Sequence, residues 1–371
     1  MNKTDKYFEN KRKCMFQEWY PTFKQVTFSS TIIPLPKIFI DYLNSDHFVS
    51  NEQEFPQYRN DDPEFLDDES WSTPRRSTIV DSKYYQSYGS DSDSDSDDSD
   101  DSNDDDKKKN SRIIKESEFQ HLLDEIKSII TKYGGYVLPK LNWSAPKDAT
   151  FMNAFCTLKC STPTDVFLLL KSSDFINHDL AQFETNEQDD DLTITPYVLV
   201  LRKWQNLTES MEFRCFVKDK KLLGISQRDT STYYSFLKDK KESIQESIES
   251  FFNQNIKDKF SQDSYTFDAY VTKENKVWLI DFNPIHPSTD SLLFDWEEFF
   301  PELIVDDEES TPISEQDKLK LIQDLEFRLI ENREGIRPNL AMESRLPMDL
   351  KDSSQSSAIN DLLEKFKDKL Q

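Results

Sequence analysis

The sequence predicts an α+β fold in which a largely antiparallel sheet is combined with several helices. Strand-like apolar segments recur between Gly135 and Pro284, and one long helix, Lys241–Phe260, interrupts them. Hydrophobic residues make up only 36% of the 371 residues, yet aromatic residues reach 13%. This composition indicates an aromatic-rich core diluted by a polar segment, and not a chain that is disordered throughout.

Helices are expected where apolar residues recur at helical spacing. They are FQEWYPTF (Phe16–Phe23), the segment that begins at IFIDYL, ESEFQHLLDEIKSIITKY (Glu116–Tyr133) and Leu319–Asn332. Gly134 and Gly135 end the third of these helices. Strands are expected in VTFSSTIIPLP and then in GYVLPKL, DVFLLLK, YVLVLRKW, MEFRCFV, LLGISQR, TFDAYV and VWLIDF.

An acidic block follows the N-terminal segment. Of the formal net charge of −25, Asp61–Asp106 contributes −14, from 17 acidic and three basic residues. Its core, Ser90–Asp106, has no apolar residue, so burial cannot offset the entropy of ordering it. We therefore expect a disordered insert, and acidity this strong argues against binding to DNA or RNA.

Several other classes of protein are not expected from the composition. The five glycines form neither GxGxxG nor GxxxxGK[ST], which excludes a dinucleotide-binding Rossmann motif and a P-loop. The four cysteines form no CxxC pair, so neither structural zinc nor a disulfide scaffold is expected. No apolar run reaches 18 residues and the N-terminus is polar, so we expect no membrane span and no signal peptide.

The strands TFDAYV and VWLIDFNP predict a hairpin that places two carboxylates opposite each other. If the turn is symmetric about Glu274–Asn275, Asp268 faces Asp281, and Asn283 points to the same side. Facing carboxylates repel unless a cation compensates them, and two Asp with one Asn suit Mg²⁺. Replacing Asp281 with Ala should then leave the ligand-free protein equally stable or more stable. The alternative is a pair of exposed acids at a strand end.

Basic residues at strand ends suggest an anion site. Lys140 ends GYVLPK just before the loop LNWSAPKDA, in which Trp143 could stack on a ligand, and Lys171 ends DVFLLLK. Glu212 and Arg214 share one face of MEFRCFV. Each feature taken alone is also what a solvated strand end or a half-buried strand shows.

Taken in order, these features resemble the ATP-grasp fold. Several longer sequence segments resemble the cell division cycle protein 123 family. They are PKLNWSAPKDA, LLLKSSDFI, LVLRKWQNLTESMEFRCFV, GISQRD, STYY and WLIDFNP with LLFDWEEF. The start, FQEWYPTFKQVTFSSTIIPLP, does so too. The resemblance covers about Phe16–Leu43 and Phe119–Phe300, and it leaves out the acidic block.

The resemblance implies an ATP-grasp-like domain that holds a nucleotide between two mainly antiparallel sheets. It further implies a cytoplasmic, monomeric assembly factor that binds ATP and Mg²⁺ and, through the gamma subunit, promotes formation of translation initiation factor 2. The nucleotide-binding residues it implies are Lys140, Asn142, Trp143, Ala145, Asp148, Lys171, Arg202, Lys203, Glu212 and Arg214. The metal ligands it implies are Asp268, Asp281 and Asn283. No nucleic-acid or membrane partner and no turnover reaction are expected.

Two other functions stay open at this point: an active ATP-grasp ligase that forms an acyl-phosphate, and an acidic histone-type chaperone. The expected organisation is an N-terminal lobe (1–60), the acidic insert (61–111), the ATP-grasp-like domain (112–300), a helical extension (301–335) and a C-terminal tail (336–371). The tail carries an apolar stripe of Leu362, Leu363, Phe366 and Leu370, which suits either docking into a partner's groove or packing back on the domain.

Overall fold

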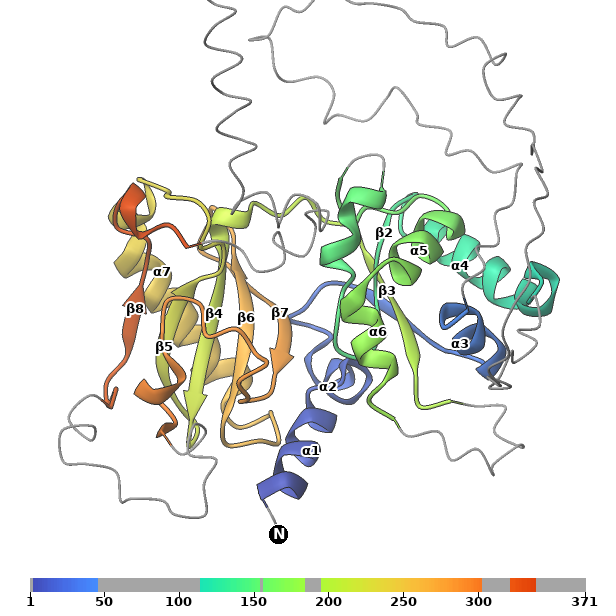
Figure 1. Cartoon of the computed structure of the whole chain (residues 1–371). Helices are drawn as coiled ribbons and strands as arrows, with labels where there is room; N and C mark the ends of the chain where they lie inside the picture. Colours follow the sequence, from blue (N-terminus) through green and yellow to red (C-terminus); the bar gives the residue numbers. More distant parts are fainter. Residues whose placement is uncertain (1–2, 46–113, 154–155, 184–194, 302–320, 338–371) are drawn as a thin grey trace, which may run out of the picture. The chain divides into compact units, whose positions relative to one another are not determined.

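Strands from distant parts of the chain assemble into two sheets (Figure 1). The computed structural model describes residues 3–45, 114–153, 156–183, 195–301 and 321–337. The acidic insert expected at 61–111 lies outside these residues, and so does the apolar stripe of the C-terminal tail. Within these ranges, no helix has the length and apolar character needed to cross a membrane.

Helices and strands alternate in mixed order, so the expected α+β class is confirmed. The helices are α1 (Lys3–Lys13), α2 (Phe16–Phe23), α3 (Lys37–Leu43), α4 (Gln120–Lys132), α5 (Pro163–Lys171), α6 (Asp174–Leu180) and α7 (Leu237–Phe251). The strands are β1 (Ser30–Pro34), β2 (Val137–Lys140), β3 (Val198–Lys203), β4 (Glu212–Lys218), β5 (Lys221–Gln227), β6 (Tyr265–Val271), β7 (Val277–Asn283) and β8 (Glu326–Arg328).

The three-stranded sheet joins the N-terminal segment to the main part of the chain. Its order is β1-β3-β2 and both pairings are antiparallel, with Ile33 opposite Leu199. Helices α4 and α5 pack on it and bury Ile126 and Val166 in the same core as Leu199 (Figure 1). The segments before and after the acidic insert therefore share one hydrophobic core.

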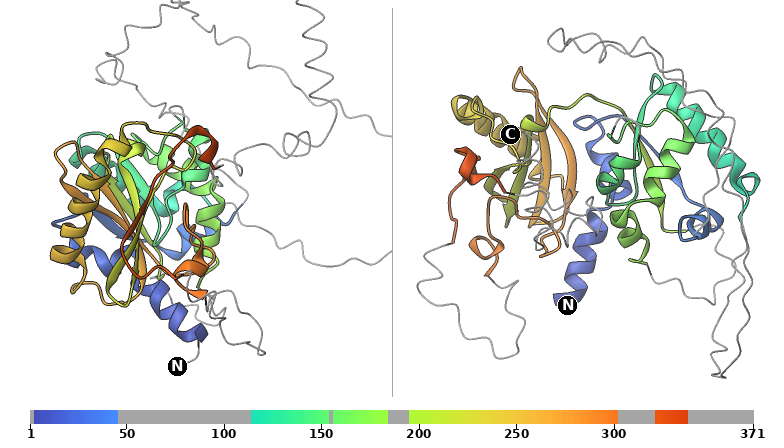
Figure 2. Two further views of the ribbon diagram at one scale, coloured as in Figure 1. Left: turned by 90° about the vertical axis from the view of Figure 1, so that its left-hand side faces the viewer. Right: turned by 45° about the horizontal axis from the view of Figure 1, so that its top comes forward.

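The five-stranded sheet has the order β7-β6-β4-β5-β8. Only β8, which is parallel to β5, departs from antiparallel pairing, so the expectation of mainly antiparallel sheets is confirmed. Helix α7 covers one face, where Ile248 shares a core with Phe213 and Phe267 (Figure 1 and Figure 2). Because side chains alternate along a strand, Arg214 and Asp268 point to the opposite face.

The chain between α2 and β1 connects the two sheets. Leu279 of β7 donates its backbone N–H to the carbonyl oxygen of Val26 at 2.8 Å, and Thr27 Oγ1 donates to the carbonyl oxygen of Leu279 at 2.6 Å. The same segment enters β1 of the other sheet at Ser30. A few residues thus hold the edge of the five-stranded sheet beside the three-stranded one.

The segment DVFLLLK, expected as a strand, is the helix α5. Thr162 caps this helix by accepting a hydrogen bond from the Asp165 N–H at 3.1 Å, Asp165 accepts one from the Thr162 N–H in return, and Pro163 occupies the first turn. The buried residues have helical spacing and are Val166, Phe167, Leu169 and Leu170. A short apolar run fits a buried strand equally well, and here the capping residues decide for the helix.

The prediction of a helix at Leu319–Asn332 is also wrong in the part of this segment that the structure describes. Glu326–Arg328 form the strand β8. Without it, β5 would be an edge strand with unpaired backbone groups, and β8 satisfies them by pairing with Gly224–Ser226. This long-range pairing, which the sequence pattern does not reveal, outweighs the local helical periodicity.

Two buried tyrosines differ in whether their hydroxyl groups are hydrogen-bonded, and this difference gives a test of the buried contacts. Tyr197 and Tyr265 are each 1% exposed, but only the Tyr197 hydroxyl donates a hydrogen bond, to the Leu180 carbonyl oxygen, whereas the Tyr265 hydroxyl has no partner among the described residues. Tyr197→Phe should lower the free energy of unfolding by about 1 kcal/mol, while Tyr265→Phe should leave it unchanged or raise it. Urea denaturation of both variants measures this, and equal losses would contradict the assignment.

Candidate functional site

A row of polar side chains crosses the five-stranded sheet on the face opposite α7. Each strand contributes one residue, and neighbours in the row are directly paired: Arg328 of β8, Ser226 of β5, Arg214 of β4, Asp268 of β6 and Asp281 of β7. Directly paired residues lie on the same face of a sheet. The register therefore brings together three residues that the sequence predicted for the site, namely Arg214, Asp268 and Asp281.

Arg214 and Asp268 form a buried bidentate ion pair. Arg214 Nε and Nη2 donate to the two carboxylate oxygens of Asp268 at 2.8 and 2.9 Å, and Nη1 donates to the carbonyl oxygen of Asp290 at 2.7 Å. Burial by itself raises the pKa of Asp268, but Arg214 and Arg228 outweigh it and hold that pKa well below its usual value. Asp268 is therefore ionised at neutral pH, and a protein side chain compensates its charge.

Lys140 reaches the second carboxylate from the other sheet. It is the last residue of β2, only 2% of it is exposed, and its Nζ lies 2.5 Å from Asp281 Oδ2. Burial lowers the pKa of Lys140, and the negative charge of Asp281 opposes this shift. The pair joins the two sheets by a direct contact between opposite charges.

The pairing of Asp268 with Asp281 is confirmed, although the register of the hairpin changes between this pair and the turn. Closer to the turn, Ala269 pairs with Leu279, one residue away from the register of a symmetric turn. Ile280 is then an extra residue in β7, and beyond this bulge the strands return to the register in which Asp268 faces Asp281.

Arg202 of β3 stabilises the bulge from the three-stranded sheet. Its Nη1 donates to the carbonyl oxygen of Ile280 at 2.9 Å, and its Nη2 donates to Thr27 Oγ1 at 3.1 Å. Burial lowers the pKa of Arg202, and the nearby Asp281 opposes this shift. The guanidinium is thus bonded to the backbone of β7, while the neighbouring Lys203 at the end of β3 is exposed.

A second charged group lies beside the row. It includes Arg228 and Lys147, which the sequence did not predict for the site. Arg228, just after β5, donates its backbone N–H to the carbonyl oxygen of Glu212 at 3.0 Å, and its Nε lies 3.4 Å from Asp268 Oδ2. Burial raises the pKa of Glu212, while Lys147 and Arg228 oppose this. Arg228 Nε is buried and makes no hydrogen bond to any described residue. Such a nitrogen favours an anionic acceptor.

The sequence does contain a signal for Arg228 and Lys147, but the signal does not show that these residues belong to the site. Arg228 lies in GISQRD and Lys147 in PKLNWSAPKDA, both of which carried the family resemblance. Placing them required the strand register, because Arg228 becomes a neighbour of Asp268 only through the pairing of β5 with β4 and of β4 with β6.

The loop after β2 uses two of its predicted ligands for internal contacts. Asn142 is fully buried, its Nδ2 donates to the carbonyl oxygen of Pro196 at 2.9 Å, and its Oδ1 accepts from the Val198 N–H at 3.1 Å. Trp143 Nε1 donates to the carbonyl oxygen of Lys11 in α1 at 2.8 Å. These side chains fix the loop against β3 and α1.

Ala145 and Asp148 of the same loop also pack inward. Ala145 contacts the core of the three-stranded sheet. Asp148 accepts hydrogen bonds from Ser173 Oγ at 2.6 Å and from the Asp174 N–H at 2.7 Å, which places its carboxylate at the N-terminus of α6. An anion is stabilised there by the unpaired N–H groups of the first turn.

Lys171 and Asn283 lie in contrasting surroundings. The Lys171 ammonium donates to the carbonyl oxygen of Tyr42 at 2.6 Å and to that of Ser45, so it binds the end of α3 and is not brought to the charged row. Asn283 lies two residues after Asp281 on the same face of β7, and its amide makes no hydrogen bond within the described residues. It therefore offers an oxygen next to the paired carboxylates.

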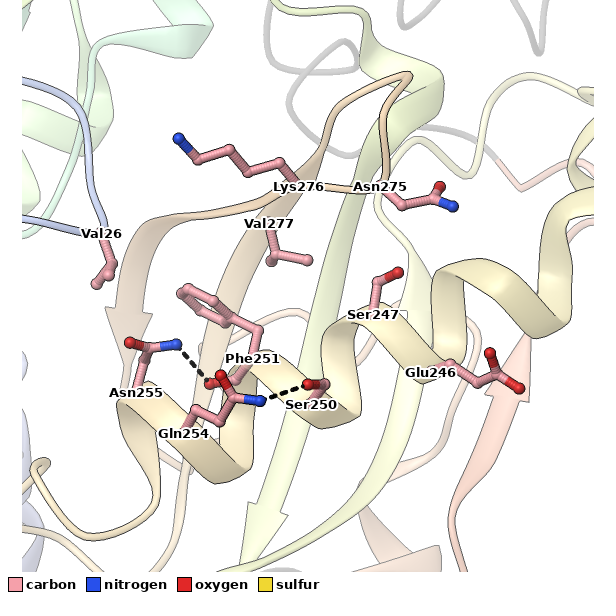
Figure 3. A pocket seen from close by; sticks show the side chains of 10 residues that line it. All are labelled: Val26, Glu246, Ser247, Ser250, Phe251, Gln254, Asn255, Asn275, Lys276 and Val277. Atoms are coloured by element: carbon pink, nitrogen blue, oxygen red, sulfur yellow. Dashed lines mark hydrogen bonds between the residues drawn. The ribbon is translucent and has the colours of Figure 1, made fainter.

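A separate hollow lies between α7 and the β6–β7 turn (Figure 3). Its volume is about 490 Å³ and none of the predicted site residues lines it. The lining residues are Val26, Glu246, Ser247, Ser250, Phe251, Gln254, Asn255, Asn275, Lys276 and Val277. This hollow is on the α7 side of the sheet and does not belong to the charged row.

These features define an α+β protein with a buried charged site where two sheets meet. The sequence profile of the D123 family matches residues 19–354, and the chain belongs to this family. It is 59% identical, over 99% of both chains, to the Dictyostelium discoideum protein named "Translation initiation factor eIF2 assembly protein". It is 36% identical to the Xenopus tropicalis protein of that name, with 95% of this chain and 94% of that protein covered.

The fold agrees with this relationship. The structure of Cdc123 from Schizosaccharomyces pombe matches with a TM-score of 0.55 and 29% identity, over 81% of this chain and 94% of that chain. A Phaeosphaeria nodorum protein named "Cell division cycle protein 123" is 35% identical over 90% of this chain and 88% of its own length. The expected relationship to the cell division cycle protein 123 family is confirmed.

The contact between Lys140 and Asp281 reverses the stability effect expected from the sequence. Asp281→Asn leaves the Lys140 charge buried without its partner, so it should lower the free energy of unfolding by about 3–5 kcal/mol. The matched control is Asp263→Asn, which removes an exposed ion pair with Lys220 and should cost at most about 1 kcal/mol. Chemical denaturation without ligand measures both, and an Asp281→Asn variant as stable as the wild type would refute the buried pair.

Proposed function

We propose that the chain binds ATP with Mg²⁺ between its two sheets, in the manner of an ATP-grasp protein. The observation that carries the proposal is the buried Nε of Arg228, which makes no hydrogen bond to any described residue and lies 3.4 Å from Oδ2 of the ionised Asp268. Phosphate oxygens are strong acceptors for a guanidinium. Lys147, in the loop after β2, lies near enough to Glu212 and Asp268 for its charge to act on both, and it would supply a second cation for the phosphates.

The proposed metal ligands are Asp268, Asp281 and Asn283. Their oxygen atoms are the donors that Mg²⁺ prefers, and the amide of Asn283, which has no partner among the described residues, fits a ligand role. When bound, Mg²⁺ would neutralise part of the phosphate charge and link the phosphates to these side chains. Arg214 and Lys140 would hold the two carboxylates in place through the contacts described above.

The loop of residues 142–148 is proposed to line the nucleotide site mainly with its backbone. The side chains of Asn142, Trp143 and Asp148 have partners within the protein, which leaves them a supporting role. Arg202 and Lys203 are proposed to lie beside the base and Glu212 beside the ribose. Lys171 is proposed to stabilise α3 and to make no contact with the nucleotide.

We further propose that the chain is a cytoplasmic, monomeric factor that promotes assembly of eukaryotic translation initiation factor 2. The support is the name of the relatives, which match this chain over nearly its full length. In this role the gamma subunit is the direct partner, and ATP serves as a ligand that fixes the relation between the two sheets and is not turned over.

The metal assignment is tested by Asn283→Ala. Because this amide has no partner among the described residues, the ligand-free variant should keep the stability of the wild type. The stabilisation by ATP–Mg²⁺, about 2.7 kcal/mol at a hundredfold excess over Kd, should largely disappear. Asn253→Ala, which removes an exposed amide from the π-helical segment Phe252–Ile256 that continues α7, is the control and should respond like the wild type. An Asn283→Ala variant with the full shift would refute the assignment.

The partner assignment is tested by titrating the purified gamma subunit of translation initiation factor 2 with the full chain. ATP–Mg²⁺ should strengthen this binding, and by linkage the gamma subunit should strengthen ATP binding by the same factor, typically about 5–150-fold. A chain that ends at Glu343, and so lacks the tail stripe, should bind more weakly. If the full chain binds no gamma subunit with or without nucleotide, the assembly role is refuted while the nucleotide site stands.

A further inference from the structure

The turn that carries Arg228 is held by a buried amide outside the charged row. Gln227 is the last residue of β5 and is fully buried. Its Nε2 donates to the carbonyl oxygens of Asp229 at 2.6 Å and Thr232 at 2.8 Å, and its Oε1 accepts from the backbone N–H of Ile330 at 3.1 Å. A buried amide is costly unless it is bonded, and this one has three partners on two segments.

The second of these segments, residues 326–337, follows the same turn along its outer side. Its strand β8 pairs with β5 immediately before Gln227. Beyond the strand, Arg337 donates its backbone N–H to the carbonyl oxygen of Thr230 at 2.8 Å, and its Nη1 donates to the carbonyl oxygen of Leu292 at 2.7 Å. The turn is thus closed from within by Gln227 and from outside by Arg337.

Internal hydrogen bonds make the turn itself rigid. Asp229 Oδ1 accepts from the Ser231 N–H at 2.9 Å, and Asp229 Oδ2 accepts from the Tyr234 hydroxyl at 2.6 Å. Arg228, by contrast, makes no hydrogen bond to any described residue through its Nε, which lies 3.4 Å from Asp268 Oδ2. The position at which the turn holds the Arg228 backbone therefore sets how its guanidinium meets that carboxylate. A group aimed in advance at a ligand loses less free energy on binding.

We propose that Gln227 is a positioning residue for the nucleotide site, which it serves by holding Arg228 in line with Asp268. The proposal rests on the nucleotide binding proposed above and assigns a task to a residue that does not itself touch the ligand. It also gives the segment 326–337 a role in the site, because the Ile330 N–H is one of the three partners of Gln227.

The test is a double-mutant cycle in the full chain, with ATP–Mg²⁺ as the probe and calorimetric titration as the measurement. Gln227→Met keeps the size of the side chain and removes its hydrogen bonds, and Arg228→Met removes the guanidinium. Gln227→Met should weaken ATP binding about tenfold, or 1.4 kcal/mol, in the wild-type background. It should change little further in the Arg228→Met background, because it acts through that residue.

A purely structural role of Gln227 would give a different result. It would weaken ATP binding equally in both backgrounds, and this result, or unchanged binding by Gln227→Met, would overturn the proposal. A wild-type chain that binds no ATP would overturn the proposed function and this inference with it.

A second pair of variants serves if Gln227→Met does not fold. Arg337→Pro removes the backbone N–H that closes the turn, and the preceding Ile336, with φ −64° and ψ 127°, already has a conformation that proline accepts after it. Arg337→Ala keeps that N–H and is the matched control. The positioning role is supported if Arg337→Pro binds ATP more weakly than Arg337→Ala and if this difference disappears in the Arg228→Met background. Equal ATP binding by the two variants overturns it.

Discussion

Lys140 carries its charge at a place with almost no access to water, and the carboxylate that balances it belongs to another sheet. Removing an ammonium group from water costs several kcal/mol unless an opposite charge with good geometry meets it. The two sheets can therefore pack only in an arrangement that brings Asp281 to Lys140. The contacts of Val26 and Thr27 with Leu279 lie next to this pair along β7 and secure that arrangement.

The charges at the site differ from those of the chain as a whole. The protein carries a formal net charge of −25. The cationic residues at the site are Lys140, Lys147, Arg202, Arg214 and Arg228, and the acidic residues are Glu212, Asp268 and Asp281. Asp179 and Asp290 also act on Lys140 and Arg214, so cations and acids occur here in similar numbers. The net charge of the whole molecule repels an anionic ligand at long range, so its binding depends on short-range contacts with individual cations of the site.

The sequence predicted most of what depends on local pattern. The amphipathic helices and most strands follow from periodicity, and α2 has the bounds that were expected. DVFLLLK shows the limit of periodicity, because a short apolar run fits a buried strand and a helix alike and only the cap at Thr162 distinguishes them. The strand β8 could not be predicted, because three residues become a strand only when the edge of β5 is available.

The contrast between local sequence pattern and long-range pairing applies to the site as well. Hairpin spacing predicts the facing carboxylates, and strand positions together with the family resemblance point to Lys140 and Arg214. What no pattern in one sequence contains is which charge meets which: that Arg214 binds Asp268, that Lys140 crosses to Asp281, and that Arg228 lies beside the first pair. These contacts depend on the pairing of strands far apart in the chain and on the packing of two sheets.

The bulge at Ile280 bears on how this hairpin can change during evolution. Arg202 and the Val26–Thr27 segment hold β7 at positions 279 and 280, so the placement of the acids does not rely on the turn at residues 272–276. Insertions or deletions in a hairpin turn normally slip the register and move side chains to the other face. Here the bulge separates the turn from the acids. Relatives can therefore vary the length of this turn while both carboxylates keep their positions.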